Sequence, residues 1–95
     1  MPSLPELREQ IDDLDHKLIA LLAERAAVVE QIGHLKNTDE EIVASDRQAQ
    51  VYATRRAWAA EAGLDPALAE AVYRAMIAYF IEQERQQLAA RSKHD

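Results

Sequence analysis

The stretch "LLAERAAVVEQIGHLK", residues Leu21 to Lys36, sets the helical register from which the chain can be interpreted. Large apolar residues recur at alternating steps of three and four from Leu4 onward, and this spacing is typical of a packed helix face. Arg25 occupies a position where the spacing calls for an apolar residue, and Lys36 closes the stripe. The pattern predicts one long helix, about residues 4–36, whose inward face carries two cations.

The composition favours a small all-α protein. The chain has 95 residues, of which 48% are hydrophobic and only 5% aromatic, and it contains no cysteine. This balance predicts a single helical domain, residues 1–95, without a disulfide, a metal site or a cofactor. No apolar run is long enough to cross a bilayer, and the net charge of −6 argues against nucleic acid. We expect a cytoplasmic protein with no nucleic-acid or membrane partner.

Two further helices follow the first. Residues 45–62 are expected to form a helix with Ser45 as its N-cap and Gly63 as its stop. Residues 66–90 should form the third helix, with Asp65 as the N-cap and a proline at the first helical position. The segment "KNTDEEIV" between the first two helices is predicted to be a loop.

The length of the first helix predicts self-association. A helix over residues 4–36 spans roughly 50 Å at ~1.5 Å per residue. A compact domain of this size has a diameter of roughly 30 Å. The helix therefore overhangs its own domain while its apolar stripe continues, and a two-fold homodimer is the simplest way to cover it.

Four cations are candidates for one binding site. Lys36 follows Arg25 by eleven residues, three helical turns, and so points the same way roughly 16 Å along the axis. Arg8 faces elsewhere by about 100°, and in an antiparallel dimer it could enter the site of the partner. Arg47 begins the next helix. Cations inside a helical bundle need a neutralising anion, and the Arg fork suits a carboxylate, so the pattern predicts a small polyanionic carboxylate as ligand. The alternative is that Arg25 snorkels or pairs with an acid on another helix.

The segment "LREQIDDLDHKLIALLAERAAVVEQIGHLK" resembles the first helix of the all-helical chorismate mutases. The likeness continues through "ASDR" and "GLDPALAEAVYRAMIAYFIEQE" and covers nearly the whole chain. The resemblance implies an intertwined homodimer with two shared active sites. The family also contains a sister activity, isochorismate-pyruvate lyase, and the segments "IVASDR" and "RRAWAAEAGLD" are similar to that branch.

The resemblance also implies a role for each candidate residue. Arg8 is expected to come from the partner chain and to hold the two substrate carboxylates together with Arg25 and Arg47. Lys36 is expected to hydrogen-bond the ether oxygen of the breaking bond and a carboxylate. Glu84 falls where bacterial members carry a glutamine that faces the same ether oxygen, and fungal mutases have Glu there.

Two positions, Ala44 and Gln48, leave the substrate open, and a third, Gln83, leaves open which residue faces the ether oxygen. Ala44 stands where a typical bacterial mutase has an acid that touches the ring hydroxyl, as in lyase-like members. Gln48, expected to contact substrate, replaces the acid that usually follows Arg47. Gln83 is the alternative to Glu84, although a shift of one residue turns a side chain by about 100°.

The rearrangement of chorismate to prephenate is pericyclic, so it requires no nucleophile, metal or proton relay. Chorismate mutase, serving aromatic amino-acid biosynthesis, is therefore the first functional hypothesis. Isochorismate-pyruvate lyase, which yields salicylate and pyruvate, is the second. A non-catalytic helical dimerisation module is the third, but it leaves the cations in the stripe unexplained. Which substrate is physiological, which pathway the protein serves and whether it is regulated do not follow from the sequence.

Overall fold

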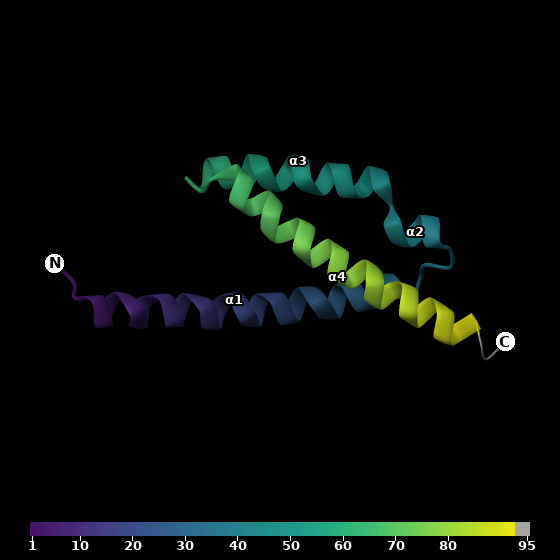
Figure 1. Cartoon of the computed structure of the whole chain (residues 1–95), viewed down its shortest axis with the longest axis horizontal. Helices are drawn as coiled ribbons and strands as arrows, with labels where there is room; N and C mark the ends of the chain where they lie inside the picture. The colour runs from purple at the N-terminus through teal and green to yellow at the C-terminus, as the bar shows by residue number, and fades with distance from the viewer. Residues whose placement is uncertain (93–95) are drawn as a thin grey trace. The chain divides into compact units, whose positions relative to one another are not determined.

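The computed structural model describes residues 1–92, and within them the chain forms helices and no strand. The described residues form three long helices and one short helix (Figure 1). They are α1 (Leu4–Gly33), α2 (Asp39–Val43), α3 (Ser45–Glu61) and α4 (Pro66–Ser92). The expectation of an all-α protein with three long helices is confirmed, while α2 lies where a loop was predicted. None of these helices is long and apolar enough to cross a membrane.

The chain divides after Ile32 into two compact units. The first unit is essentially one helix. Ser3 caps its start, because the Ser3 hydroxyl accepts a hydrogen bond from the main-chain N–H of Glu6 at 3.3 Å. The large apolar residues of its stripe are between 42% and 65% exposed. These residues are Leu4, Leu7, Ile11, Leu14, Leu18, Ile19, Leu21, Val28 and Ile32. This face is therefore largely uncovered in the single chain.

The second unit is built on an antiparallel pair of helices, α3 and α4 (Figure 1). The turn between them is a Schellman motif, in which the N–H of Leu64 bonds to the carbonyl of Ala59 at 2.8 Å and that of Gly63 to Ala60 at 3.2 Å. Gly63 has φ of 76°, which a residue without a Cβ adopts readily. Its predicted role as the stop of this helix is confirmed.

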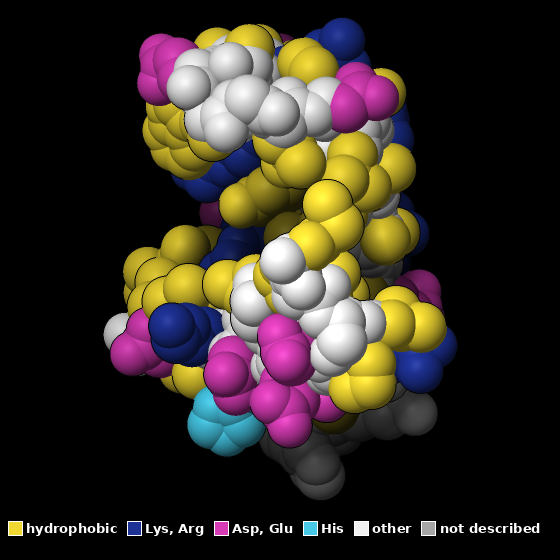
Figure 2. Space-filling model, turned by 90° about the vertical axis from the view of Figure 1, so that its left-hand side faces the viewer, with side chains coloured by type: hydrophobic (Ala, Val, Ile, Leu, Met, Phe, Trp, Pro, Cys, Tyr) yellow, Lys and Arg dark blue, Asp and Glu magenta, His cyan; other side chains and the backbone are white. Residues whose placement is uncertain are grey.

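Helix α4 begins as the sequence predicts. The Asp65 carboxylate accepts a hydrogen bond from the N–H of Ala67 at 2.9 Å, and Pro66 is the first helical residue. The core of this unit is small and consists of Ile42, Val51, Ala59 and Ala69, each less than 9% exposed. Figure 2 shows, accordingly, many hydrophobic side chains at the surface.

The first helix is shorter than predicted. It ends at Gly33, and His34 and Leu35 form a turn in which the N–H of Lys36 bonds to the Gly33 carbonyl at 3.2 Å. Glycine is a poor helix former, which favours an end at this position. Lys36 consequently lies outside the helix. The three-turn spacing from Arg25 does not fix the direction in which Lys36 points.

Helix α2 has a capping signal that the sequence reasoning missed. Thr38 is its N-cap and accepts from the N–H of Glu41 at 3.1 Å, while the Glu41 carboxylate accepts from the Thr38 hydroxyl and, at 3.4 Å, from the N–H of Asn37. Thr followed three residues later by Glu is the sequence signature of a capping box. The segment interpreted as a loop therefore contains one helical turn.

The start of α3 also differs from expectation. Ser45 is its first helical residue, and Ala44 occupies the N-cap position without a side-chain hydrogen bond. Ala44 has φ of 45° and ψ of 58°, in the left-handed region that a Cβ disfavours. Ala44 is both the C-cap of α2 and the N-cap of α3, so this conformation lies at the junction that joins the two helices directly.

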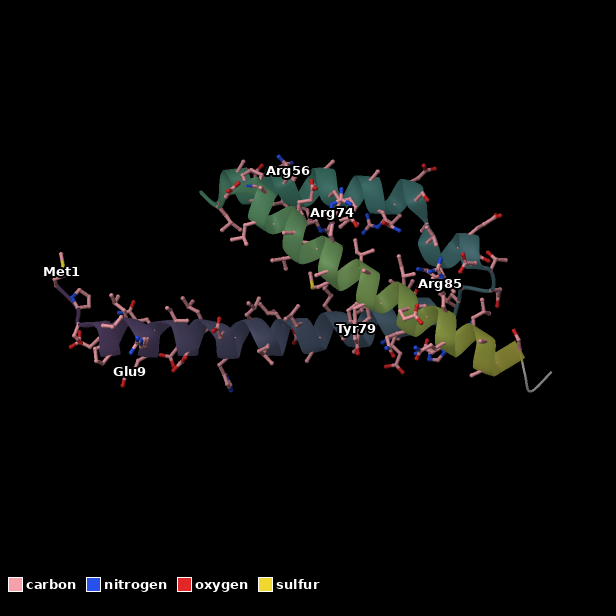
Figure 3. The ribbon with its side chains drawn as sticks, viewed as in Figure 1. Met1, Glu9, Arg56, Arg74, Tyr79 and Arg85 are labelled. Carbon is pink, nitrogen blue, oxygen red and sulfur yellow. The ribbon has the colours of Figure 1, made fainter. Side chains whose placement is uncertain are left out.

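Ion pairs and ring contacts link α3 to α4 at the surface. Arg56 on α3 and Arg74 on α4 both bond to Glu70, at 3.2 Å and 2.9 Å, and Figure 3 shows the two arginines on neighbouring helices. The Arg74 guanidinium also lies over the Tyr52 ring at 4.2 Å. The hydrogen bond from Arg74 lowers the pKa of Glu70 below its usual value. Because these groups are exposed, the pairs add little stability.

Candidate active site

Lys36 and Glu84, both predicted as catalytic, lie in direct contact. The Lys36 ammonium donates to a Glu84 carboxylate oxygen at 3.1 Å, across a separation of 48 residues. Glu84 is only 7% exposed, and it is the buried charged residue in the described part of the chain. A buried carboxyl requires such a partner, because burial without one is strongly unfavourable.

The Lys36 ammonium has a second protein acceptor in α2. It donates to the main-chain carbonyl of Ile42 at 3.4 Å, and Ile42 itself is 3% exposed. An ammonium group has three N–H donors. Two are therefore directed at Glu84 and the Ile42 carbonyl, and the third is available to a ligand. The Lys36 side chain remains 21% exposed, so a small molecule could reach it.

Gly33 allows Glu84 to approach the end of α1. A Cβ placed on Gly33 would lie 3.3 Å from Glu84 Cγ and 3.4 Å from the side-chain oxygen of Gln87. The separation from Glu84 Cγ is tighter than an ordinary van der Waals contact, so an added methyl would push on the Glu84 side chain. Gly33 therefore serves close packing. The packing partner is the side chain that contacts Lys36.

The remaining predicted residues of this unit lie elsewhere. Arg47 is exposed and donates to the Gln50 side chain at 2.6 Å, one turn along its own helix. Gln48 donates to the main-chain carbonyl of Val43 at 2.6 Å, and the Tyr52 hydroxyl donates to the Gln48 side-chain oxygen at 3.5 Å. The structure thus gives Gln48 a local bonding role beside α2, and it does not bring Arg47 to Lys36.

Arg8 and Arg25 belong to the first unit. Arg8 is exposed and Arg25 is partly buried along α1. Their predicted roles as carboxylate-binding residues remain predictions. Gln83, the alternative to Glu84, is also only partly buried, whereas Glu84 is the residue that meets Lys36.

Two arginines of α4 that the sequence reasoning did not single out hold the segment around Lys36. Arg85 forms a two-pronged ion pair with Asp39 at the start of α2, at 2.6 Å and 3.1 Å, and Figure 3 shows Arg85 extending from α4 towards α2. The hydrogen bond from Arg85 lowers the pKa of Asp39 below its usual value near 3.8. Arg91 donates to the main-chain carbonyls of His34 and Lys36. Arg is a common residue near helix C-termini, so no local signal distinguished Arg91.

The chemistry available at this site is electrostatic. A cation and a carboxyl meet in a partly buried position, and no cysteine exists in the chain to act as a nucleophile. No group of three His, Asp or Glu side chains within residues 1–92 is arranged to hold a metal ion. Such a pair can orient a polar ligand and stabilise charge that develops on it.

The fold and the site together define an all-helical protein with an internal ammonium–carboxyl pair. The family model of chorismate mutase type II matches residues 7–85. The chain belongs to the chorismate mutase type II family.

Relatives of two kinds are similar to the chain. It is 39% identical over 75 residues to the T-protein of Haemophilus influenzae, covering 78% of this chain and 20% of that protein. It is 39% identical over 72 residues to the T-protein of Enterobacter agglomerans, covering 75% and 19%. It is 30% identical over 81 residues to the isochorismate pyruvate lyase of Pseudomonas aeruginosa, covering 85% and 80%. The chain thus spans about a fifth of the T-proteins and most of the lyase.

Proposed function

We propose that the protein is a chorismate mutase that converts chorismate to prephenate in aromatic amino-acid biosynthesis. The observation that carries this proposal is the contact between Lys36 and the buried Glu84 at 3.1 Å, in a chain of the chorismate mutase type II family. These are the two residues that the family resemblance assigns to the ether oxygen. Their contact supports the proposal that both side chains act on the same ether oxygen of the substrate.

In this reaction the ether C–O bond breaks while a new C–C bond forms within one molecule. The enzyme contributes by folding the flexible dianion into its reactive shape and by stabilising the negative charge that grows on the ether oxygen. In the proposed site, Arg8, Arg25 and Arg47 hold the two carboxylates, and Gln48 contacts the substrate beside them. Lys36 and Glu84 donate hydrogen bonds to the ether oxygen, and no cofactor takes part.

Substrate binding requires two adjustments of the contacts in the single chain. Arg47 must leave Gln50, which is inexpensive because both side chains are exposed. Glu84 accepts a hydrogen bond from Lys36 in the structure, but only a protonated carboxyl can donate to an ether oxygen.

A homodimer with shared sites is part of the proposal. The stripe of α1 is uncovered in the single chain, and a second copy supplies a matching apolar face. The resemblance assigns Arg8 to the site of the partner. Chains carrying Arg8→Ala should therefore regain activity when mixed with chains carrying Arg25→Ala, because each heterodimer would contain one intact site. No recovery after confirmed subunit exchange would refute the shared site.

Isochorismate-pyruvate lyase is the second candidate function. Ala44 replaces the acid expected in a bacterial mutase, and the chain covers 80% of a curated isochorismate pyruvate lyase. The lyase reaction is also pericyclic and splits an enolpyruvyl ether, so the same cations and the same pair could serve it. Ala44 therefore bears on which substrate is used rather than on the kind of catalysis.

The deciding experiment is to incubate the purified protein separately with chorismate and with isochorismate and to identify the products. Prephenate from chorismate, with the higher kcat/KM, is expected. Salicylate and pyruvate from isochorismate with a much higher kcat/KM would establish the lyase instead. A folded protein that turns over neither substrate would favour the third hypothesis, a non-catalytic helical dimerisation module.

A further inference from the structure

Arg91 binds the main chain on both sides of the turn that follows α1. One terminal nitrogen of its guanidinium donates to the carbonyl of His34 at 3.1 Å, and the other donates to the carbonyl of Lys36 at 2.7 Å. These carbonyls follow Gly33, the last residue of α1, so no further helical turn provides their partners. Within the second unit, Arg91 thus donates the hydrogen bonds that these two carbonyls would otherwise receive from the next turn of a longer helix.

This contact matters because Lys36 lies outside any helix. Its main chain makes one turn hydrogen bond, from its N–H to the Gly33 carbonyl at 3.2 Å, and the bond from Arg91 is the shorter of the two. A lysine side chain is long and flexible, so the position of its ammonium depends on how firmly its backbone is held. The bond from Arg91 to the Lys36 carbonyl is partly buried, which shields it from competition by water, whereas the bond to the His34 carbonyl is exposed.

Glu84 and Arg91 act from the same side of α4. They are seven residues apart, which is close to two helical turns, so their side chains leave the helix in nearly the same direction about 10 Å apart. Glu84 accepts from the side-chain ammonium of Lys36, and Arg91 donates to its main-chain carbonyl. One face of α4 therefore holds both the side-chain ammonium and the main-chain carbonyl of Lys36.

We propose that Arg91 is a positioning residue for Lys36, which fixes the backbone of Lys36 so that its ammonium is preorganised beside Glu84. The consequence for catalysis rests on the proposed function. A misplacement of about 1 Å in a catalytic group can reduce the rate on the order of 100-fold. The planar guanidinium is needed because its two terminal nitrogens reach two carbonyls at once, whereas an ammonium is a single point.

The test combines a backbone measurement with kinetics. Hydrogen–deuterium exchange of peptides covering residues 34–38 should be faster in Arg91→Gln than in the unaltered protein, since local opening becomes easier. Its kcat should fall about 10- to 100-fold on the substrate that the protein turns over. Arg91→Lys should recover only part of this loss. Arg74→Gln, which removes another ion-paired arginine from the same helix, should change neither quantity.

A double-variant cycle separates positioning from general stabilisation. If Arg91 acts through Lys36, Arg91→Gln should reduce kcat less than about 2-fold when Lys36→Met is already present. A full 10- to 100-fold reduction in that background would overturn the proposal. Unchanged exchange of residues 34–38 in Arg91→Gln would overturn it independently of activity. A protein inactive on both substrates would refute the proposed function, and the exchange measurement would still decide whether Arg91 anchors Lys36.

Discussion

Residues 1–32 and residues 33–92 differ in how far the single chain covers their apolar side chains. The first region is one helix whose large apolar residues are 42% to 65% exposed, so its regular pattern has no cover within the chain. The second region has a small core of its own, and its buried carboxyl, Glu84, is paired with Lys36. The difference shows that a strong amphipathic pattern specifies a helix without providing the surface against which it packs.

This difference has consequences for stability. Isolated helices gain most of their stability in proteins from the packing of their apolar face, since intrinsic helix formation is only marginally favourable in water. The first region therefore depends on a partner surface. The second region can retain its helical pair by burying Ile42, Val51 and the alanines between its helices.

The largest expected effect comes from charging the stripe of the first region. Leu18→Glu places a carboxylate in the centre of the face that the proposed dimer buries, so self-association and activity should both be lost. Sedimentation and helical circular dichroism would measure the change. Ala23→Glu is the matched control, because Ala23 lies about 140° around the helix from Leu18 and is exposed. Equal behaviour of the two variants would show that the stripe is not the interface.

Within the second region, the largest expected effect comes from Lys36→Met. This variant keeps most of the side chain but removes the donor, so kcat should fall on the order of 100- to 1,000-fold. It also leaves the buried Glu84 without its cation, and unfolding should become easier by about 2–3 kcal/mol. Chemical denaturation and steady-state kinetics would measure the two losses.

The double variant Lys36→Met with Glu84→Gln separates these two losses. A neutral amide needs no cation, so most of the stability should return while kcat remains low. If activity returned together with stability, Lys36 would be structural rather than catalytic.

A smaller effect is expected from Glu84→Gln alone. A carboxylate can only accept hydrogen bonds, whereas an amide also carries N–H donors that can reach an ether oxygen. Glu84→Gln should therefore retain activity, while Glu84→Ala, which supplies no donor, should lose it. Glu82→Ala is the control, since Glu82 is exposed and its loss should leave kcat unchanged. Equal activities of Glu84→Gln and Glu84→Ala would remove Glu84 from the ether oxygen.

The smallest effect concerns Ala44. Glycine at this position relieves the left-handed conformation with φ of 45°, so Ala44→Gly should stabilise the fold by about 1 kcal/mol. Ala53→Gly, in the interior of α3, should destabilise it by a similar amount. Thermal unfolding would measure the change in stability of each variant. A loss of stability in Ala44→Gly would contradict the backbone conformation described for this junction.

Some features of the site were within reach of the sequence and others were not. The family resemblance placed Lys36 and Glu84 separately at the ether oxygen, and the structure brings the two side chains into contact, while their catalytic roles stay predictions. Arg91 was missed because its role depends on two main-chain carbonyls, which every residue possesses and no sequence pattern reports. Helix α2 was missed although Thr38 and Glu41 form a recognisable capping box.

The sequence by itself determined the three long helices, the starts of α1 and α4 and the end of α3. The three- and four-residue spacing, Asp65, Pro66 and Gly63 act over a few residues, so their physical effects can be judged locally. Only the tertiary structure decided that Lys36 meets Glu84, 48 residues further along the chain. That contact depends on where α4 lies against the turn after Gly33. Packing between distant segments, rather than local propensity, sets that position.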